Sequence, residues 1–407
     1  MKKPSESVAS HVPGGRRFLV RAIVPALLIG CSAGTAVAGP TFTFGKEGSV
    51  TLSYLTQMWT QYKSYSAPNN NSASTQFFLR RNRINLAGQF NNYLGFYVQL
   101  DAPSDARSQY GAPGSVARNV FYRDAYLTFN YSDAIRLIGG VFKQTFTREN
   151  LEDCFGPLTL DRSTGIAYTP FGGTRDAGIA LWGNLHNAMF QYRVMVANGR
   201  NNPAIMPKHL PRITARFTVS LLDPEYAYGY EGTYLGTKKV LTLGVAYDYQ
   251  KDVAYADYAA RKDPVSYKAW TADVFYEYPF STGTYTFSTA YMHYDTGNAI
   301  NNSNHDVSLP INTQLSGYYV KAAYMLPHKV GIGRVQFFAR HEQWNYHLTS
   351  GLYDARWNSG GINYYIDGQN LKITAAFARV THPHQAPSSS PALRDYNQAT
   401  LGVQMIF

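Results

Sequence analysis

The sequence is poor in cysteine, in charged residues and in long apolar runs, and each shortage excludes a class of protein. Only Cys31 and Cys154 occur among 407 residues, which excludes a disulfide framework and paired-cysteine metal or haem sites. Charged residues make up 15% of the chain. The mean hydropathy is −0.29, and no apolar run of about 18 residues follows residue 38. A bundle of membrane-spanning helices is therefore excluded.

The N-terminal segment is typical of a secretory signal peptide. A basic stretch precedes the apolar run "AIVPALLIG", and Ala36 and Ala38 provide a small-residue cleavage site. We expect residues 1–38 to be removed and residues 39–407 to form the mature domain, in which Cys154 is the sole cysteine. The stretch "LIGC" also resembles a lipoprotein cleavage box, so lipidation at Cys31 stays open.

Signals for enzymatic chemistry and for nucleic-acid binding are weak. "HPHQ" and "HEQWNYH" lack the His-Glu-x-x-His spacing of a zinc site, and nothing resembles a nucleophile elbow. The net charge of +11 is spread along the chain and is not gathered in a basic tail. We therefore expect no catalytic residue, cofactor, metal or nucleic-acid partner.

The dominant pattern is an alternation of apolar and polar residues with a period of two, as in "FFLRRNRINLAGQF" at residues 77–90. Segments of this kind recur sixteen times and predict strands. They lie near 49–62, 76–90, 92–101, 118–131, 134–146, 174–184, 187–198, 211–222, 238–251, 266–279, 283–295, 314–326, 332–346, 354–367, 369–381 and 395–407.

The connections between these strands alternate between short turns, such as "NYSDA" and "IDGQN", and long polar loops. Only "LLDPEYAYGYEGTYLGTKK", at residues 221–239, is long where a short turn is due. Every predicted strand has one apolar face, and the charges lie on the other. These features predict an all-β protein, a transmembrane antiparallel barrel of sixteen strands with lipid outside and water inside. The final strand, "NQATLGVQMIF", resembles the C-terminal signal of outer-membrane barrels.

Basic residues dominate the face predicted to line the lumen. Arg193, Arg212 and Arg216 fall on consecutive strands and are expected to form one basic patch. Guanidinium groups in a pore attract anions and repel cations. The alternative is a general porin whose arginines only order water. The predicted pore-lining set is Arg81, Arg83, Arg193, Arg212, Arg216, Lys321, Arg340 and Lys372.

The longest connection, residues 147–173, contains apolar residues that an exterior loop has little reason to carry. We expect this third loop to fold into the barrel and constrict the pore; an extracellular lid or a subunit contact is the alternative. Its geometry decides whether Arg162 or the acids Asp153 and Asp161 meet the arginine wall. The predicted constriction residues are Arg148, Glu149, Glu152, Asp153, Asp161 and Arg162.

Several segments, among them "FLRRNRINLAGQFNNYLGFYVQLD", "LDRSTGIAYTPFGGTRDAGIALWG" and "GGINYYIDGQNLKITAAFARV", together resemble the phosphate-selective porin O and P family. They follow the family order over about residues 49–407. The resemblance implies a trimeric porin of the Gram-negative outer membrane with sixteen strands and an inward third loop. It does not imply phosphate selectivity, because four acidic residues accompany Arg148 and Arg162 in that loop.

The sequence thus predicts passive diffusion of small hydrophilic solutes, with a preference for anions or oxyanions such as phosphate. Two alternatives belong to other classes. The barrel could be the sleeve of an electron-transfer or oxyanion-reduction complex, with a periplasmic or multihaem cytochrome partner. It could also be a barrel hydrolase, for which His341 and Ser163 would be the residues to test. The expected contacts are small anions, outer-membrane lipid and two further copies of the chain.

Overall fold

The protein is described by a computed structural model that covers residues 39–103, 120–163, 170–171, 173–202, 204–301, 303–348, 353–384 and 393–407. The predicted signal peptide and Cys31 lie outside the described residues, as do residues 164–169 of the long third loop.

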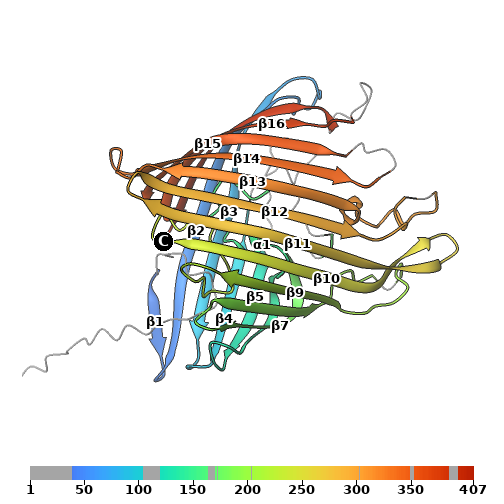
Figure 1. The fold of residues 1–407 in the computed structure, drawn as a ribbon, viewed down its shortest axis with the longest axis horizontal. Helices are drawn as coiled ribbons and strands as arrows, with labels where there is room; N and C mark the ends of the chain where they lie inside the picture. The colour runs from blue at the N-terminus through green and yellow to red at the C-terminus, as the bar shows by residue number, and fades with distance from the viewer. Residues whose placement is uncertain are drawn as a thin grey trace, which may run out of the picture.

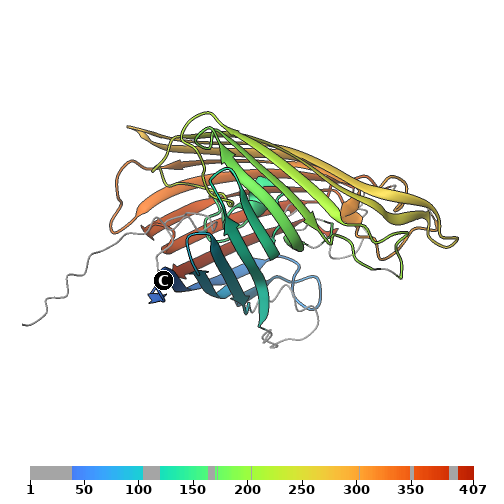
Figure 2. The same ribbon diagram turned by 90° about the horizontal axis from the view of Figure 1, so that it is seen from below.

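Sixteen antiparallel strands form one closed sheet, in which each strand pairs with its neighbours in the sequence and β17 pairs with β2 (Figures 1 and 2). The register of the closing pair runs from Gln398 opposite Lys63 to Ile406 opposite Leu55. The strands are β2 (Gly48–Lys63), β3 (Ser74–Gln89), β4 (Leu94–Asp101), β5 (Phe121–Asn130), β6 (Arg136–Lys143), β7 (Arg175–Leu185), β8 (Phe190–Ala197), β9 (Arg212–Ser220), β10 (Val240–Asp257), β11 (Lys262–Phe280), β12 (Gly283–Asp295), β13 (Leu315–Met325), β14 (Arg334–Tyr346), β15 (Ala355–Asp367), β16 (Leu371–Thr381) and β17 (Tyr396–Ile406).

Three short elements complete the described fold. Strand β1 (Thr41–Phe44) pairs with the start of β2 as an antiparallel hairpin beside the barrel. Helix α1 (Arg148–Leu151) follows β6, and its N-cap Thr147 accepts a hydrogen bond from the Asn150 main-chain N–H at 3.1 Å. A 3-10 turn, η2 (Ile311–Thr313), precedes β13.

The sixteen predicted strands are confirmed, but β10 and β11 extend further than expected. The sequence predicted that β10 ends near residue 251 and that β11 starts near residue 266. In the structure β10 continues to Asp257 and β11 starts at Lys262, and their hairpin projects beyond its neighbours in Figure 1. Their pairing shifts between Gln250 and Ala254. A bulge of this kind interrupts the period-two pattern. Alternation alone therefore ended β10 too early and started β11 too late.

The two faces of the barrel differ in polarity as predicted. On β9, the side chains of Ile213 and Phe217 are 47% and 55% exposed, whereas Arg212 and Arg216 are buried inside. Because successive side chains of a strand point to opposite faces, the same division repeats around the barrel. The exterior is therefore an apolar surface, and the charges lie in the interior.

Within the described ranges, no helix is long and apolar enough to cross a membrane.

Candidate functional site

The third connection, from β6 to β7, lies inside the barrel over its described residues. Lys372 of β16 donates to the Phe155 carbonyl oxygen at 2.7 Å, and Asn363 of β15 donates to the Leu158 carbonyl oxygen at 3.0 Å. On β13, the Lys321 ammonium lies 2.8 Å from the Glu149 carboxylate. The segment thus crosses the interior and is held by strands far from β6 and β7.

The connection between β9 and β10, residues 221–239, also folds into the barrel. Its Tyr230 carbonyl oxygen accepts a hydrogen bond from the Asp153 N–H at 3.0 Å, and its Tyr230 N–H donates to the Leu151 carbonyl oxygen at 3.2 Å. A third main-chain bond joins Gly232 to Gly156 at 3.1 Å. The two connections therefore form a parallel ladder in the interior, and the long turn that broke the sequence pattern has a structural role.

An ion pair joins the same two connections. Both terminal nitrogens of Arg148 donate to the carboxylate of Glu225, at 2.8 and 2.7 Å, and both side chains are buried. The guanidinium carbon lies 3.9 Å from the centre of the Phe275 ring and 4.4 Å from that of Tyr230. Bidentate geometry and aromatic neighbours make this pair the central link between the two connections.

Arg193, Arg212 and Arg216 lie on one wall as expected, but they do not form an open basic patch. Arg193 donates to the Tyr228 carbonyl oxygen and to the Tyr230 hydroxyl, both on the β9–β10 connection. The two arginines of β9 pair with aspartates of the next strands: Arg212 with Asp248, and Arg216 with Asp273. All three are covered, and two are neutralised, so this wall is unavailable to a solute.

The other predicted inward residues also point into the barrel, each with a partner. Arg81 pairs with Asp161, Arg83 with Asp101, and Arg340 with Glu342, at 2.8, 2.8 and 3.0 Å. Lys372 and Lys321 hold the third connection, as described above. The direction of these side chains follows from alternation along each strand, whereas their pairing with counterions does not.

The acidic residues of the third connection have different environments. Burial opposes ionisation of Glu149, but the Lys321 ion pair and the Ser163 hydrogen bonds overcome it and lower its pKa. Burial raises the pKa of Glu152, and Lys321, which lies 3.7 Å away, only partly offsets this. Asp153 pairs with Lys143 at 3.1 Å. These three acids are therefore engaged by the barrel wall.

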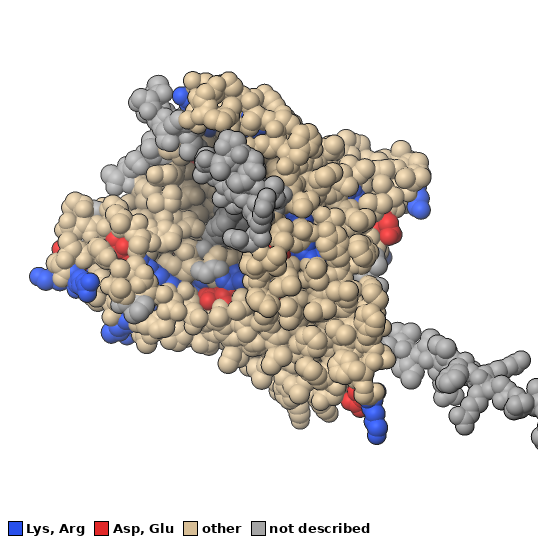
Figure 3. Space-filling view, turned by 180° about the vertical axis from the view of Figure 1, so that it is seen from behind, with Lys and Arg blue, Asp and Glu red and all other residues tan. Residues whose placement is uncertain are grey.

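One cavity of about 340 Å³ lies between the third connection and the wall of β2, β3 and β14–β17. Figure 3 shows a hollow into this interior, with basic and acidic side chains at its base. Among the described residues that line the cavity, Asp161 provides the one carboxylate, whereas the arginines number five. These are Arg80, Arg81, Arg123, Arg162 and Arg340.

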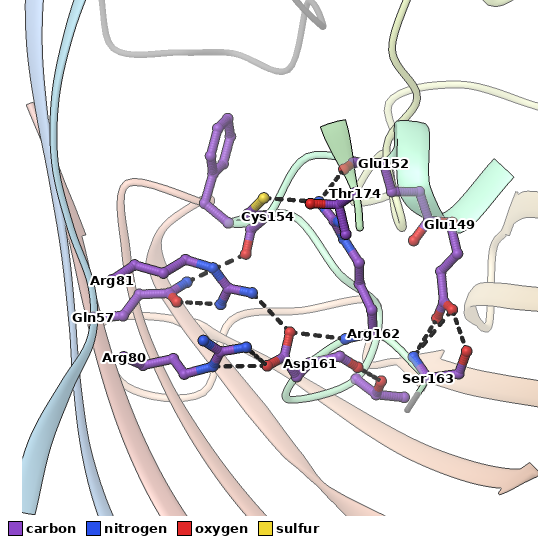
Figure 4. A network of polar contacts seen from close by, with 12 residues as sticks. Gln57, Arg80, Arg81, Glu149, Glu152, Cys154, Asp161, Arg162, Ser163 and Thr174 are labelled. Atoms are coloured by element: carbon purple, nitrogen blue, oxygen red, sulfur yellow. Dashed lines mark hydrogen bonds and ion pairs between the residues drawn. The ribbon is translucent and has the colours of Figure 1, made fainter. Parts of the chain in front are cut away.

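The carboxylate of Asp161 lies between two neighbouring arginines of β3 (Figure 4). Arg80 approaches it to 2.9 Å and Arg81 to 2.8 Å. The main chain of the same loop turns toward Arg340, which donates to the carbonyl oxygens of Asp161 and Arg162 at 2.9 and 3.0 Å. One carboxylate is thus shared by two guanidinium groups, and arginines outnumber carboxylates among the described residues that line the cavity.

Arg80 and Arg123 are the cavity arginines that the period-two pattern missed. Pairing of β3 with β2 shifts between Gln57 and Met58, so that Arg80 has no opposite residue. Pairing of β5 with β4 shifts likewise, between Gln99 and Leu100, and leaves Arg123 as the extra residue. A bulge lets two consecutive side chains point the same way, and here each adds an arginine to the interior.

A signal for both bulges exists in the sequence. Strict alternation would place one residue of "RR" at 80–81, and one of "RD" at 123–124, on the lipid side. An arginine at the middle of the lipid face costs about 2–4 kcal/mol. Adjacent charged residues in the middle of a predicted strand therefore indicate a bulge.

Cys154 lies next to the cavity arginines, and Arg162 donates to its sulfur at 2.7 Å. Burial alone would raise the pKa of this thiol, but Arg162, Arg83 and Arg81 lower it well below its usual range. The sulfur is therefore a further partner of this cluster of arginines, which favours its ionised form. Nothing in the sequence pattern indicated this role.

One known protein family matches most of this chain. The model of the family described as phosphate-selective porin O and P matches residues 53–407. The chain belongs to this family. It is accordingly a porin of the Gram-negative outer membrane.

Solved structures share the porin's fold at low sequence identity. An anion-selective porin from Comamonas acidovorans is 11% identical with a TM-score of 0.58; the match covers 89% of this chain and 100% of that one. The outer membrane channel DcaP of Acinetobacter baumannii is 13% identical with a TM-score of 0.56, and the match covers 91% and 100% of the two chains. Salmonella typhi OmpF is 13% identical with a TM-score of 0.53, and the match covers 89% and 99%. No curated protein sequence matches the porin significantly.

The residues considered for a hydrolase lie on opposite faces of the porin. The Ser163 hydroxyl is inside and donates to Glu149 at 2.6 Å. His341 alternates with the inward Arg340 and Glu342 on β14 and contacts Asn358 and Tyr318. Because of this separation, His341 cannot act as the base for Ser163. Within the described part of the chain, no group of three or more His, Cys, Asp or Glu side chains could hold a metal ion.

Glu231 of the β9–β10 connection is buried among other acids. Its two carboxyl oxygens have no hydrogen-bond partner among the described residues. Burial raises the pKa of Glu231 well above its usual range, with contributions from Asp153, Glu152 and Glu225 that Lys143 only partly offsets. This carboxyl group therefore keeps its proton to a higher pH in the folded porin than in the unfolded chain.

Replacing Glu231 by glutamine is expected to stabilise the porin at high pH. Above about pH 4.5 the unfolded chain releases this proton while the folded porin retains it, so the free energy of unfolding falls as pH rises. Glu231→Gln removes that loss. Thermal unfolding in detergent, followed by circular dichroism, should show a higher melting temperature for the variant at about pH 8 and little difference at about pH 4. A wild type and variant that differ equally at both pH values would contradict this.

Proposed function

We propose that the porin allows passive diffusion of small hydrophilic solutes, with a preference for anions. The observation that carries this proposal is the cavity with five arginines and one carboxylate. Positive charge confined between low-dielectric walls raises the local concentration of anions and lowers that of cations. The similarity to a structure described as an anion-selective porin supports the same preference.

We propose further that the third connection constricts the pore and that the β9–β10 connection holds it in place. The ladder and the Arg148–Glu225 pair join the two connections to each other. Contacts with Arg193 of β8 and Phe275 of β11 hold them against that side of the barrel. Solutes would then pass through the arginine cavity, which lies between the third connection and the wall of β2, β3 and β14–β17. The residues proposed to act on a permeating anion are Arg80, Arg81, Arg123, Arg162 and Arg340.

The alternatives from the sequence gain no support. A sleeve for a cytochrome needs an open lumen, and this interior is occupied by two of the chain's own connections. A hydrolase needs a nucleophile and a base in contact, which Ser163 and His341 are not. We retain a homotrimer and a cleaved signal peptide as proposals; the mass of the detergent-solubilised protein and its N-terminal sequence test them.

Uptake into proteoliposomes tests the proposed function. Glutamate and lysine are similar in size and opposite in charge, and arabinose is neutral. We expect all three solutes to enter and glutamate to enter several times faster than lysine, because the cavity arginines attract the net negative charge of glutamate. An interaction free energy of about 1.4 kcal/mol would correspond to a tenfold preference. Faster uptake of lysine would contradict anion preference, and exclusion of arabinose would contradict a diffusion pore.

A further inference from the structure

The arginine cavity has a second kind of wall, which is apolar. Trp59 of β2, Phe338 of β14 and Trp357 of β15 line it together with Leu160 of the third connection. All these side chains face the inside of the barrel, so contact with lipid does not explain them. A wall that passes only hydrated inorganic ions gains nothing from aromatic surface, because exposing such surface to water is unfavourable.

The aromatic rings and the guanidinium groups are adjacent. The guanidinium carbon of Arg80 lies 5.6 Å from the centre of the Trp59 ring, and that of Arg340 lies 5.4 Å from the centre of the Trp357 ring. An anionic group that pairs with either arginine would therefore place its attached carbon body beside a tryptophan. This arrangement matches a ligand that carries its negative charge at the edge of a flat apolar group.

Size and charge agree with such a ligand. A volume of about 340 Å³ falls within the range of sites for small organic molecules and is far larger than a chloride or phosphate ion needs. The excess of arginine over carboxylate among the lining residues favours an anion, and the guanidinium fork matches a carboxylate. We propose that this cavity is a binding site for small aromatic carboxylates, which the porin takes up in preference to inorganic anions. The proposal rests on the proposed function and narrows its solute class.

Single-channel recording with competing anions tests the site. In KCl, the current through the wild type is measured with added benzoate, cyclohexanecarboxylate, acetate or phosphate. Benzoate and acetate share one carboxylate and differ by the ring. We expect benzoate to interrupt the current at a concentration roughly tenfold lower than acetate requires, with cyclohexanecarboxylate between them. Equal block by benzoate and acetate, or stronger block by phosphate, would overturn the proposal.

Tryptophan variants test whether the advantage of benzoate over acetate arises in this cavity. Trp357→Leu and Trp59→Leu should bring the benzoate value close to that for acetate, whereas Trp357→Phe should retain most of the difference. Trp270→Leu is the matched control, since Trp270 lies on the outer face of β11 with 45% of its surface exposed. The unblocked KCl conductance of each variant reports folding. A benzoate effect that survives in the Trp59/Trp357 double variant would overturn the site.

One further measurement distinguishes failure of the aromatic-carboxylate site from failure of the proposed function. The zero-current potential in a KCl gradient is measured in the same bilayer before any organic anion is added. Anion preference without an advantage for benzoate would overturn the aromatic site and leave the proposed function intact. Cation preference would overturn both.

Discussion

Arg80→Ser combined with Arg81→Ser is expected to abolish the anion preference of the porin. These two guanidinium groups share Asp161, so removing both changes this part of the cavity from net positive to net negative. A unit charge about 4 Å from an ion contributes about 1 kcal/mol even at the dielectric constant of water, so the permeability ratio of chloride to potassium should fall at least roughly tenfold. Zero-current potentials in planar bilayers under a KCl gradient measure this ratio.

Two further variants serve as comparisons for that result, one expected to raise the anion preference and one expected to leave it unchanged. Asp161→Asn keeps both arginines and removes their acid, so the anion preference should increase. Arg261→Ser removes an exposed arginine of the β10–β11 hairpin and should leave the ratio unchanged. An unchanged ratio in the Arg80/Arg81 double variant, or a lower ratio in Asp161→Asn, would exclude this cavity from the selectivity of the pore.

Breaking the Arg148–Glu225 pair is expected to destabilise the interior and enlarge the pore. Arg148→Met leaves a buried carboxylate without its bidentate partner, which costs about 3–5 kcal/mol. The two connections should then separate, giving a larger and noisier single-channel conductance and a lower melting temperature. Both quantities are measured on the purified porin in detergent or in bilayers.

A double-mutant cycle separates this link from general damage. Arg148→Met combined with Glu225→Gln removes both charges and should be more stable than the sum of the single effects predicts. Arg379→Met disrupts an exposed pair with Asp395 and serves as the control, with an expected cost of about 0–1 kcal/mol. Additive effects at Arg148 and Glu225, with an unchanged conductance, would show that this pair does not hold the constriction.

The strands and their faces were predictable because lipid outside and water inside impose a period of two on every strand. On β9, for example, Arg212 and Arg216 are buried, whereas Ile213 and Phe217 alternate with them and are exposed. The pairing with counterions was harder to predict, because the partners Asp248 and Asp273 come from later strands. Alternation does not show which side chains meet across a curved sheet. The two bulges moved Arg80 and Arg123 into the cavity and broke the simple pattern.

The inward connections were only partly predictable. Apolar residues at 147–173 indicated that the third loop packs on something, and its described residues do lie inside. For residues 221–239, the sequence showed an unusual length and many tyrosines but no partner. The partner of Glu225 is Arg148, 77 residues away, and the ladder depends on main-chain groups that carry no sequence signature. Contacts of this kind follow from the closed barrel and not from local pattern.

The zero-current potential of the wild-type porin under a KCl gradient is the most direct test of anion preference. The excess of arginine over carboxylate in the cavity predicts a potential shifted toward the equilibrium potential of chloride, and a shift that shrinks as salt screens the field. A potential near zero at low salt, or one shifted toward the equilibrium potential of potassium, would contradict anion preference.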